Sequence, residues 1–130
     1  MVDSEAGKEL VRRYLEEAWN QGNIAVLDEL FTPELVTRLT ALVGAFRTGF
    51  PDWNCVIDDF VVEGDKVVNR WSATATHTGD FFGIPATGRP VSVEGITIHQ
   101  IADGRIVADW SQSDQLVLMQ QLGVVPAPGQ

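Results

Sequence analysis

The residues best suited to acid–base chemistry lie in the last third of the chain, on either side of the turn signal Asp103-Gly104. His99 precedes this turn and Asp109 follows it, each within an alternating run that is typical of a strand. If a three-residue loop joins the two strands and closes into a bulge, odd-numbered residues share one face and His99 lies nearly opposite Asp109. A carboxylate beside an imidazole fixes its tautomer and raises its basicity. This pattern predicts His99 as a general base and Asp109 as the group that orients it.

The same register separates polar from apolar side chains. Beside the candidate pair lie the hydroxyl groups of Thr97 and Ser111, which can donate hydrogen bonds to a substrate oxygen. The polar face comprises Thr97, His99, Asp109, Ser111 and Ser113. The opposite face comprises Ile96, Ile98, Ile106, Ala108 and Trp110. A strict two-residue loop would pair the faces differently and separate His99 from Asp109. In the plainest alternative the polar residues face solvent.

Three further side chains are candidates, and each has a structural alternative. Asp114 ends the last strand, where it is either an acid at a pocket rim or the N-cap of the next helix. Arg70 either anchors an anionic or enolate oxygen or forms a surface ion pair. His77, at a strand end, is expected to bond the following loop. With two histidines and no H-x-H or C-x-x-C spacing we expect no metal. We also expect no cofactor, because the chain has no glycine-rich phosphate-binding motif.

The composition is that of one globular domain. The chain has 130 residues, of which 45% are apolar and 21% charged. Its net charge of −9 disfavours nucleic acid and anionic membranes as partners. The single cysteine, Cys55, excludes an intrachain disulfide. The start MVDSEAGKEL lacks the positive charge and apolar stretch of a signal peptide, and no apolar run is long enough to span a membrane. We therefore expect a cytoplasmic protein.

The first half of the chain has helical periodicity. Apolar side chains between residues 10 and 19 recur as one helical stripe, which predicts a helix with an N-cap at Ser4 and a stop at Gly22. A short second helix covers residues 24–31. Thr32-Pro33-Glu34 reads as the N-cap and first turn of a third helix.

The second half changes to the two-residue period of strands. The predicted strands are Trp53–Glu63, Lys66–His77, Val91–Ala102 and Arg105–Asp114, followed by a closing helix at Gln115–Leu122. Helices followed by an antiparallel meander predict an α+β domain, with N-terminal helices packed on a curved sheet of four or more strands that forms a cone. We expect one domain over residues 1–123 and a loose tail over 124–130. The interior of such a cone predicts a small-molecule pocket, which Tyr14 and Trp19 would line unless they are simply core.

A series of short motifs runs through the chain in a fixed order. The N-terminal motifs are YLEEAWNQGN at residues 14–23 and LDELF at 27–31. The central motifs are GDKVV at 64–68, RW at 70–71, THTG at 76–79, GIP at 83–85, TG at 87–88 and GI at 95–96. The C-terminal motifs are DGRIV at 103–107, Trp110, Asp114 and QLG at 121–123. Together they cover nearly the whole chain, which resembles the SnoaL-like polyketide cyclases.

The resemblance implies a nuclear-transport-factor-2-like α+β cone, usually dimeric, and a cofactor-free intramolecular aldol cyclisation. The chain departs from the family's pattern in two places. The segment after Phe31 is shortened, and Thr37 is its nearest match to a polar pocket residue. The positions that correspond to the catalytic aspartate and the pocket histidine of the cyclases hold Ser111 and Thr97.

Residues and resemblance together predict a cofactor-free acid–base enzyme that acts on a small apolar, oxygenated ligand. The candidate residues are His99, Asp109 and Asp114 for catalysis, and Thr97, Ser111, Arg70, Tyr14, Trp19 and Thr37 for substrate binding. The alternatives are a non-catalytic binding or assembly module of the same fold, and an isomerase or epoxide-opening hydrolase. The apolar hairpin face predicts a homodimer. The shortened segment predicts a wide or shallow pocket.

Overall fold

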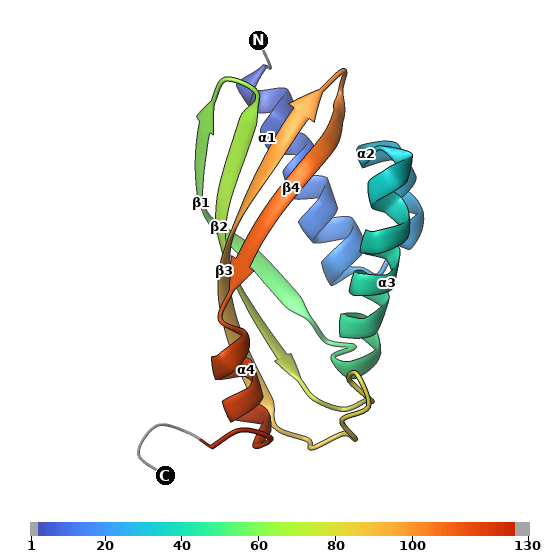
Figure 1. The fold of residues 1–130 in the computed structure, drawn as a ribbon, viewed down its shortest axis with the longest axis vertical. Helices are drawn as coiled ribbons and strands as arrows, with labels where there is room; N and C mark the ends of the chain where they lie inside the picture. The colour runs from blue at the N-terminus through green and yellow to red at the C-terminus, as the bar shows by residue number, and fades with distance from the viewer. Residues whose placement is uncertain (1–2, 127–130) are drawn as a thin grey trace.

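The structure, a computed structural model, describes residues 3–126. Helices cover one face of a curved antiparallel sheet with the strand order β1-β2-β3-β4 (Figure 1). The strands are β1 (Asn54–Glu63), β2 (Lys66–Thr76), β3 (Pro90–Ala102) and β4 (Arg105–Ser113). The helices are α1 (Ser4–Arg13), η1 (Tyr14–Asn20), η2 (Ile24–Val26), α2 (Leu27–Leu30), α3 (Pro33–Gly49) and α4 (Gln115–Leu122). The predicted α+β architecture is confirmed, and residues 127–130 of the predicted tail lie outside the described residues.

The first predicted helix is in fact two segments of different winding. α1 begins one residue earlier than predicted, because Asp3 rather than Ser4 is the N-cap and accepts a hydrogen bond from the backbone of Glu5 at 3.0 Å. The chain then continues without a break into the π-helical segment η1. Gly22, with φ of +76°, ends it as predicted.

The π-helical winding places two aromatic side chains on the same side of η1. In an α-helix, residues five apart differ by about 140° in direction. A π-helix has wider turns with i→i+5 hydrogen bonds, such as the one from Gln21 N to Glu16 O at 3.1 Å. Tyr14 and Trp19 therefore come together, with ring centroids 6.4 Å apart.

Side chains from two other elements hold the end of η1 in place. The amide of Asn20 pairs with the backbone of Cys55 in β1, donating to its carbonyl at 2.8 Å and accepting from its N–H at 2.7 Å. Arg47 of α3 donates to the carbonyls of Trp19 and Asn20 at 3.1 and 2.9 Å. The bonds from Arg47 satisfy carbonyl groups that a helix end leaves unpaired. Together the four bonds tie η1 to both the sheet and α3.

The turn between β3 and β4 is shorter than predicted. Ala102 pairs with Arg105, so only Asp103 and Gly104 form the loop, and both have positive φ. This is the geometry of a two-residue turn of the type that Asp-Gly favours. The predicted three-residue loop is wrong.

A bulge in β4 nevertheless produces the predicted pairing. Ile106 pairs with Ile101, but the next residue, Val107, has no residue opposite it on β3. Beyond the bulge the predicted pairs are formed, His99 with Asp109 and Thr97 with Ser111. Ile106 precedes the bulge, so it does not join the outer face as predicted but is fully buried.

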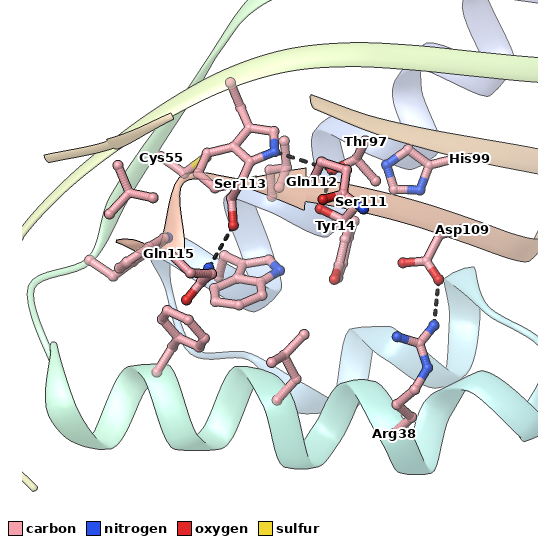
Figure 2. Close-up of a pocket in the computed structure, with 17 residues that line it drawn as sticks. Tyr14, Arg38, Cys55, Thr97, His99, Asp109, Ser111, Gln112, Ser113 and Gln115 are labelled. Atoms are coloured by element: carbon pink, nitrogen blue, oxygen red, sulfur yellow. Dashed lines mark hydrogen bonds and ion pairs between the residues drawn. The ribbon is translucent and has the colours of Figure 1, made fainter. Parts of the chain in front are cut away.

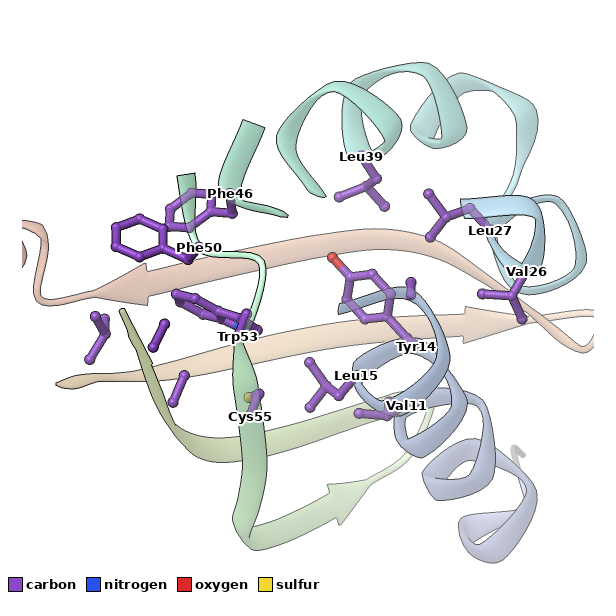
Figure 3. Packing of buried hydrophobic residues seen from close by; sticks show 14 of the residues in the cluster. Val11, Tyr14, Leu15, Val26, Leu27, Leu39, Phe46, Phe50, Trp53 and Cys55 are labelled. Carbon is purple, nitrogen blue, oxygen red and sulfur yellow. The ribbon is translucent and has the colours of Figure 1, made fainter. Parts of the chain in front are cut away.

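The core lies between the helices and the inner face of the sheet (Figure 3). At one end, aromatic rings of Phe46, Phe50, Trp53 and Phe81 pack with centroids 4.9 to 6.3 Å apart. Buried His77 accepts a hydrogen bond at Nδ1 from the backbone N–H of Thr87 at 3.2 Å, so it bonds the loop as predicted. None of the helices in residues 3–126 is long and apolar enough to cross a membrane.

One glycine permits an aromatic side chain to lie flat on the sheet. A Cβ atom on Gly95 would lie 2.7 Å from Cε2 of Trp71 and closer still to Cζ2. In this position the indole Nε1 of Trp71 donates to Thr97 Oγ1 at 3.1 Å. Because Gly95 has no side chain, the Trp71 indole can lie against β3 and hold the hydroxyl group of Thr97 in position.

We predict that Gly95→Ala destabilises the domain by about 1–3 kcal/mol, because the added methyl group forces the Trp71 indole away from the strand. Urea unfolding measures the effect. Gly44→Ala in α3 is the matched control, since nothing lies within 4 Å of its Cβ position and alanine favours a helix. Equal stability of Gly95→Ala and the unaltered protein would contradict the close packing of Trp71.

Candidate active site

A cavity of about 350 Å³ lies among η1, α3 and the inner face of the sheet (Figure 2). This volume lies at the lower end of the range for small-molecule sites. Its apolar lining comprises Leu15, Trp19, Leu42, Phe46, Trp53, Cys55, Trp71 and Val93. Its polar lining comprises Tyr14, Arg38, Thr97, His99, Asp109, Ser111, Gln112, Ser113 and Gln115. The site thus combines an apolar wall with a polar one.

The cavity extends from exposed residues to buried ones. Gln112 and Gln115 are exposed, whereas His99 is fully buried and the Asp109 side chain is 7% exposed. α3 follows α2 after only two intervening residues, so the chain turns directly into this helix as predicted. The cavity is nonetheless not shallow, because it reaches the buried His99.

The structure brings six of the nine predicted site residues together. Those that line the cavity are Tyr14, Trp19, Thr97, His99, Asp109 and Ser111. The other three are placed elsewhere. Asp114 is the N-cap of α4 and accepts from Val117 N at 3.0 Å. Arg70 is 56% exposed and lies 3.8 Å from Asp58 in an ion pair, and Thr37 is exposed on α3.

His99 is oriented by a residue other than the one predicted. Its Nε2 lies 3.1 Å from Nδ2 of Asn69, a fully buried residue of β2, while its Nδ1 is buried without a partner. Burial lowers the pKa of His99 from 6.5 to about 4, and the nearby charge of Asp109 only partly opposes this effect. His99 is therefore a neutral imidazole at pH 7.

Asp109 forms an ion pair that the sequence did not indicate. Its Oδ1 accepts a hydrogen bond from Nη2 of Arg38, which reaches across from α3 (Figure 2). The two residues are 71 positions apart in the chain. Because Arg38 is 54% exposed, this cation remains partly hydrated while it compensates a buried carboxylate.

Two hydroxyl groups next to the acid–base pair share a hydrogen-bond chain. The indole of Trp71 can only donate, so Thr97 Oγ1 accepts from it at 3.1 Å. Thr97 Oγ1 and Ser111 Oγ lie 2.9 Å apart and share one further hydrogen bond. Whichever hydroxyl donates in that bond, the other keeps its hydrogen for another acceptor. The pair thus supplies one donor to the cavity.

Tyr14 contributes a second donor and an aromatic contact. Its ring packs edge-on against His99, with centroids 5.9 Å apart. Burial raises the pKa of Tyr14 well above its usual value, so the phenol keeps its proton.

Among residues 3–126, no group of three or more His, Cys, Asp or Glu side chains gathers as a metal site would require.

Sequence patterns did not identify Arg38 and Asn69 as residues of the site. Arg38 looks like any polar residue on the exposed side of a helix, and its partner is far away in the chain. Asn69 did carry a signal, because it lies on the same face of the strand as the buried residues Ala73 and Ala75. An asparagine among inward-facing apolar residues requires a hydrogen-bond partner.

Comparisons with known proteins give a consistent result. The SnoaL-like polyketide cyclase family matches residues 9–122. TsrD from Streptomyces laurentii is 32% identical, with a TM-score of 0.89 over 96% of this chain and 100% of that one. A candidate SnoaL-like polyketide cyclase from Jannaschia sp. CCS1 is 26% identical, with a TM-score of 0.85 over 97% and 99%. IdmH from Streptomyces antibioticus, a candidate polyketide cyclase, is 28% identical, with a TM-score of 0.77 over 90% and 98%. A search of curated proteins returned no match.

We predict that the buried imidazole makes stability depend on pH. Since the pKa of His99 is about 4 in the folded protein and 6.5 without burial, the unfolded chain binds the extra proton between these values. The contribution of His99 to the free energy of unfolding is complete above pH 6.5. It falls by on the order of 3 kcal/mol as the pH drops toward 4. Urea unfolding of the protein and of His99→Gln at pH 4.5, 5.5 and 7 isolates this contribution. If the free energies of unfolding of the two proteins change in parallel with pH, burial does not lower the pKa of His99.

Proposed function

The chain belongs to the SnoaL-like polyketide cyclase family, and from this premise we propose that it catalyses a cofactor-free intramolecular aldol cyclisation. The substrate would be a polyketide-like or other apolar, oxygenated molecule. One observation supports the proposal most: the buried carboxylate of Asp109 lines the cavity together with a neutral imidazole and a pair of hydroxyl groups. A base and hydrogen-bond donors on one wall are what enolate chemistry requires.

In this proposal Asp109, rather than His99, is the base. The Nε2 atom of His99 is engaged with Asn69, and burial keeps the pKa of the ring at about 4. Asp109 uses Oδ1 to accept from Arg38, which leaves Oδ2 for a proton. Oδ2 would remove a proton from the carbon next to a substrate carbonyl group, leaving an enolate.

The hydroxyl pair would stabilise the enolate. The free hydrogen of Thr97 or Ser111 would donate to the enolate oxygen while the carbon attacks a second carbonyl carbon of the same molecule. One carbon–carbon bond forms, and the new alkoxide takes back the proton held by Asp109. No electron acceptor or further reactant is consumed, so the step balances without a cofactor.

The apolar wall would hold the carbon skeleton. Trp19 lies next to Trp53 and Phe46, with ring centroids 5.6 and 5.4 Å apart. Flat rings of this kind bury large apolar area and bind flat, unsaturated ligands well. Folding a flexible chain against this wall would bring its two reacting carbons together.

The isomerase alternative uses the same base, because it too begins with proton removal beside a carbonyl group. An epoxide hydrolase of the predicted kind needs two carboxylates around a water molecule. Within the described lining, Asp109 is the one carboxylate, which disfavours that alternative. A binding module would show ligand binding without proton exchange.

We predict that the protein accelerates deuterium exchange at the methyl group of acetophenone in D₂O, measured by NMR. Asp109→Asn should lower this acceleration about a hundredfold or more, because an amide cannot accept the proton. Asp59→Asn, on the exposed part of β1, is the control and should exchange like the unaltered protein. If Asp109→Asn retains full exchange, Asp109 is not the base. Binding of the ketone without exchange would favour the binding module.

We also propose a homodimer through the outer face of the sheet. Ile96 and Trp110 each leave about half of their surface exposed there, although Ile106 does not contribute. Apolar patches of this kind in soluble proteins are typical of interfaces. Light scattering at micromolar concentration should give the mass of a dimer, and Trp110→Lys should shift it to a monomer. A monomer mass for the unaltered protein would exclude the dimer.

A further inference from the structure

A buried asparagine contacts the imidazole without lining the cavity. Asn69 lies in the central strand β2, opposite Thr97 of β3, and is fully buried. Its side chain reaches along the inner face to His99, where its Nδ2 lies 3.1 Å from Nε2. Because Asn69 is not among the cavity-lining residues, any effect on a bound molecule must pass through His99.

Two arrangements of this hydrogen bond differ in the polar atoms that they leave unpaired. If Asn69 donates through Nδ2, its Oδ1 is the atom without a partner, as in the structure. If the amide were turned over, Oδ1 would accept from an Nε2–H and both amide hydrogens would be buried where Oδ1 is now. The first arrangement leaves Asn69 Oδ1 and the Nδ1–H of His99 unpaired, and the second leaves the amide hydrogens and the Nδ1 lone pair unpaired. The negative charge of Asp109, opposite His99 on the next strand, favours a hydrogen over a lone pair at the free ring nitrogen. The arrangement in which Asn69 donates, as in the structure, is therefore favoured.

This donation fixes the position of the proton on His99. A neutral imidazole that accepts at Nε2 carries its hydrogen at Nδ1. A second proton at Nε2 would place two N–H groups face to face, so the bond also opposes the imidazolium form. We propose that Asn69 is a positioning residue that holds His99 as the Nδ1–H tautomer, a neutral hydrogen-bond donor.

The Nδ1–H lies on the side of the molecule where the candidate base is found. Nδ1 is buried without a hydrogen-bond partner, its ring contacts Tyr14 of η1, and Asp109 of β4 pairs with His99 across the hairpin. Asp109 in turn is bound to Arg38 of α3. The inference rests on the proposed function in one respect: the Nδ1–H would support the negative charge that moves from Asp109 to the neighbouring substrate oxygen during the reaction. The tautomer itself does not depend on any activity.

The tautomer is measured by two-bond ¹⁵N–¹H correlation NMR on the protein labelled at histidine. At pH 7 we expect the pattern of an Nδ1–H imidazole for His99. Asn69→Asp replaces the donor by a carboxylate of the same shape, which accepts from Nε2–H, so the pattern should change to the other tautomer or to imidazolium. Asn54→Asp, at an exposed position of β1, adds the same charge and should leave the His99 pattern unchanged.

Asn69→Leu tests the bond without adding a charge. This variant lacks any donor to Nε2, so His99 should no longer show a single Nδ1–H pattern. An Nε2–H pattern in the unaltered protein, or an unchanged Nδ1–H pattern in a folded Asn69→Leu, would overturn the inference.

Exchange into acetophenone then separates the inference from the proposed function. We expect Asn69→Asp to reduce the exchange rate about tenfold, the effect of losing one well-placed donor, and to alter its dependence on pH, whereas Asn54→Asp does neither. If no variant exchanges, the proposed function fails while the NMR result still decides the tautomer. If the tautomer changes and the exchange rate does not, His99 has no part in the reaction and the positioning role is overturned.

Discussion

One extra residue in β4 determines which side chains can meet in the cavity. Side chains alternate between the two faces of a strand, so without the bulge at Val107 the residues that follow Ile106 on the inner face would be Ala108 and Trp110. Asp109 and Ser111 would then face outward. The ion pair with Arg38 and the hydroxyl pair with Thr97 both require the inward placement. The whole polar wall therefore depends on a local irregularity of the hairpin.

Much of the architecture followed from sequence patterns because those patterns report burial. The change from helical to two-residue period located the strands and α4 within a residue or so of their observed bounds. The pairing of His99 with Asp109 was also predicted, although through a three-residue loop rather than a two-residue turn with a bulge. Local sequence cannot distinguish these routes, since both add one residue to the same connection.

The partners of the central residues could not be predicted in the same way. Arg38 meets Asp109 only because the fold places α3 opposite β4, which is a tertiary arrangement. The π-helical winding of η1 is likewise invisible to hydrophobic periodicity, because a short segment with a wider turn still presents an apolar stripe. Burying the carboxylate of Asp109 costs free energy, which the nearby cation of Arg38 offsets. The electrostatics of the site are thus properties of the fold and not of any one segment.

The π-helical segment has a consequence for how such a cavity changes during evolution. A π-helix differs from an α-helix by accommodating a longer stretch of chain in each turn, so loss of one residue between Tyr14 and Asn20 would leave an ordinary helix of nearly the same length. Tyr14 and Trp19 would then be four residues apart, the spacing of side chains that share one face of an α-helix. Both rings would keep facing the cavity, and the sheet with its polar wall would stay in place. This helix can therefore gain or lose one residue without rotating the cavity wall, which an ordinary α-helix cannot.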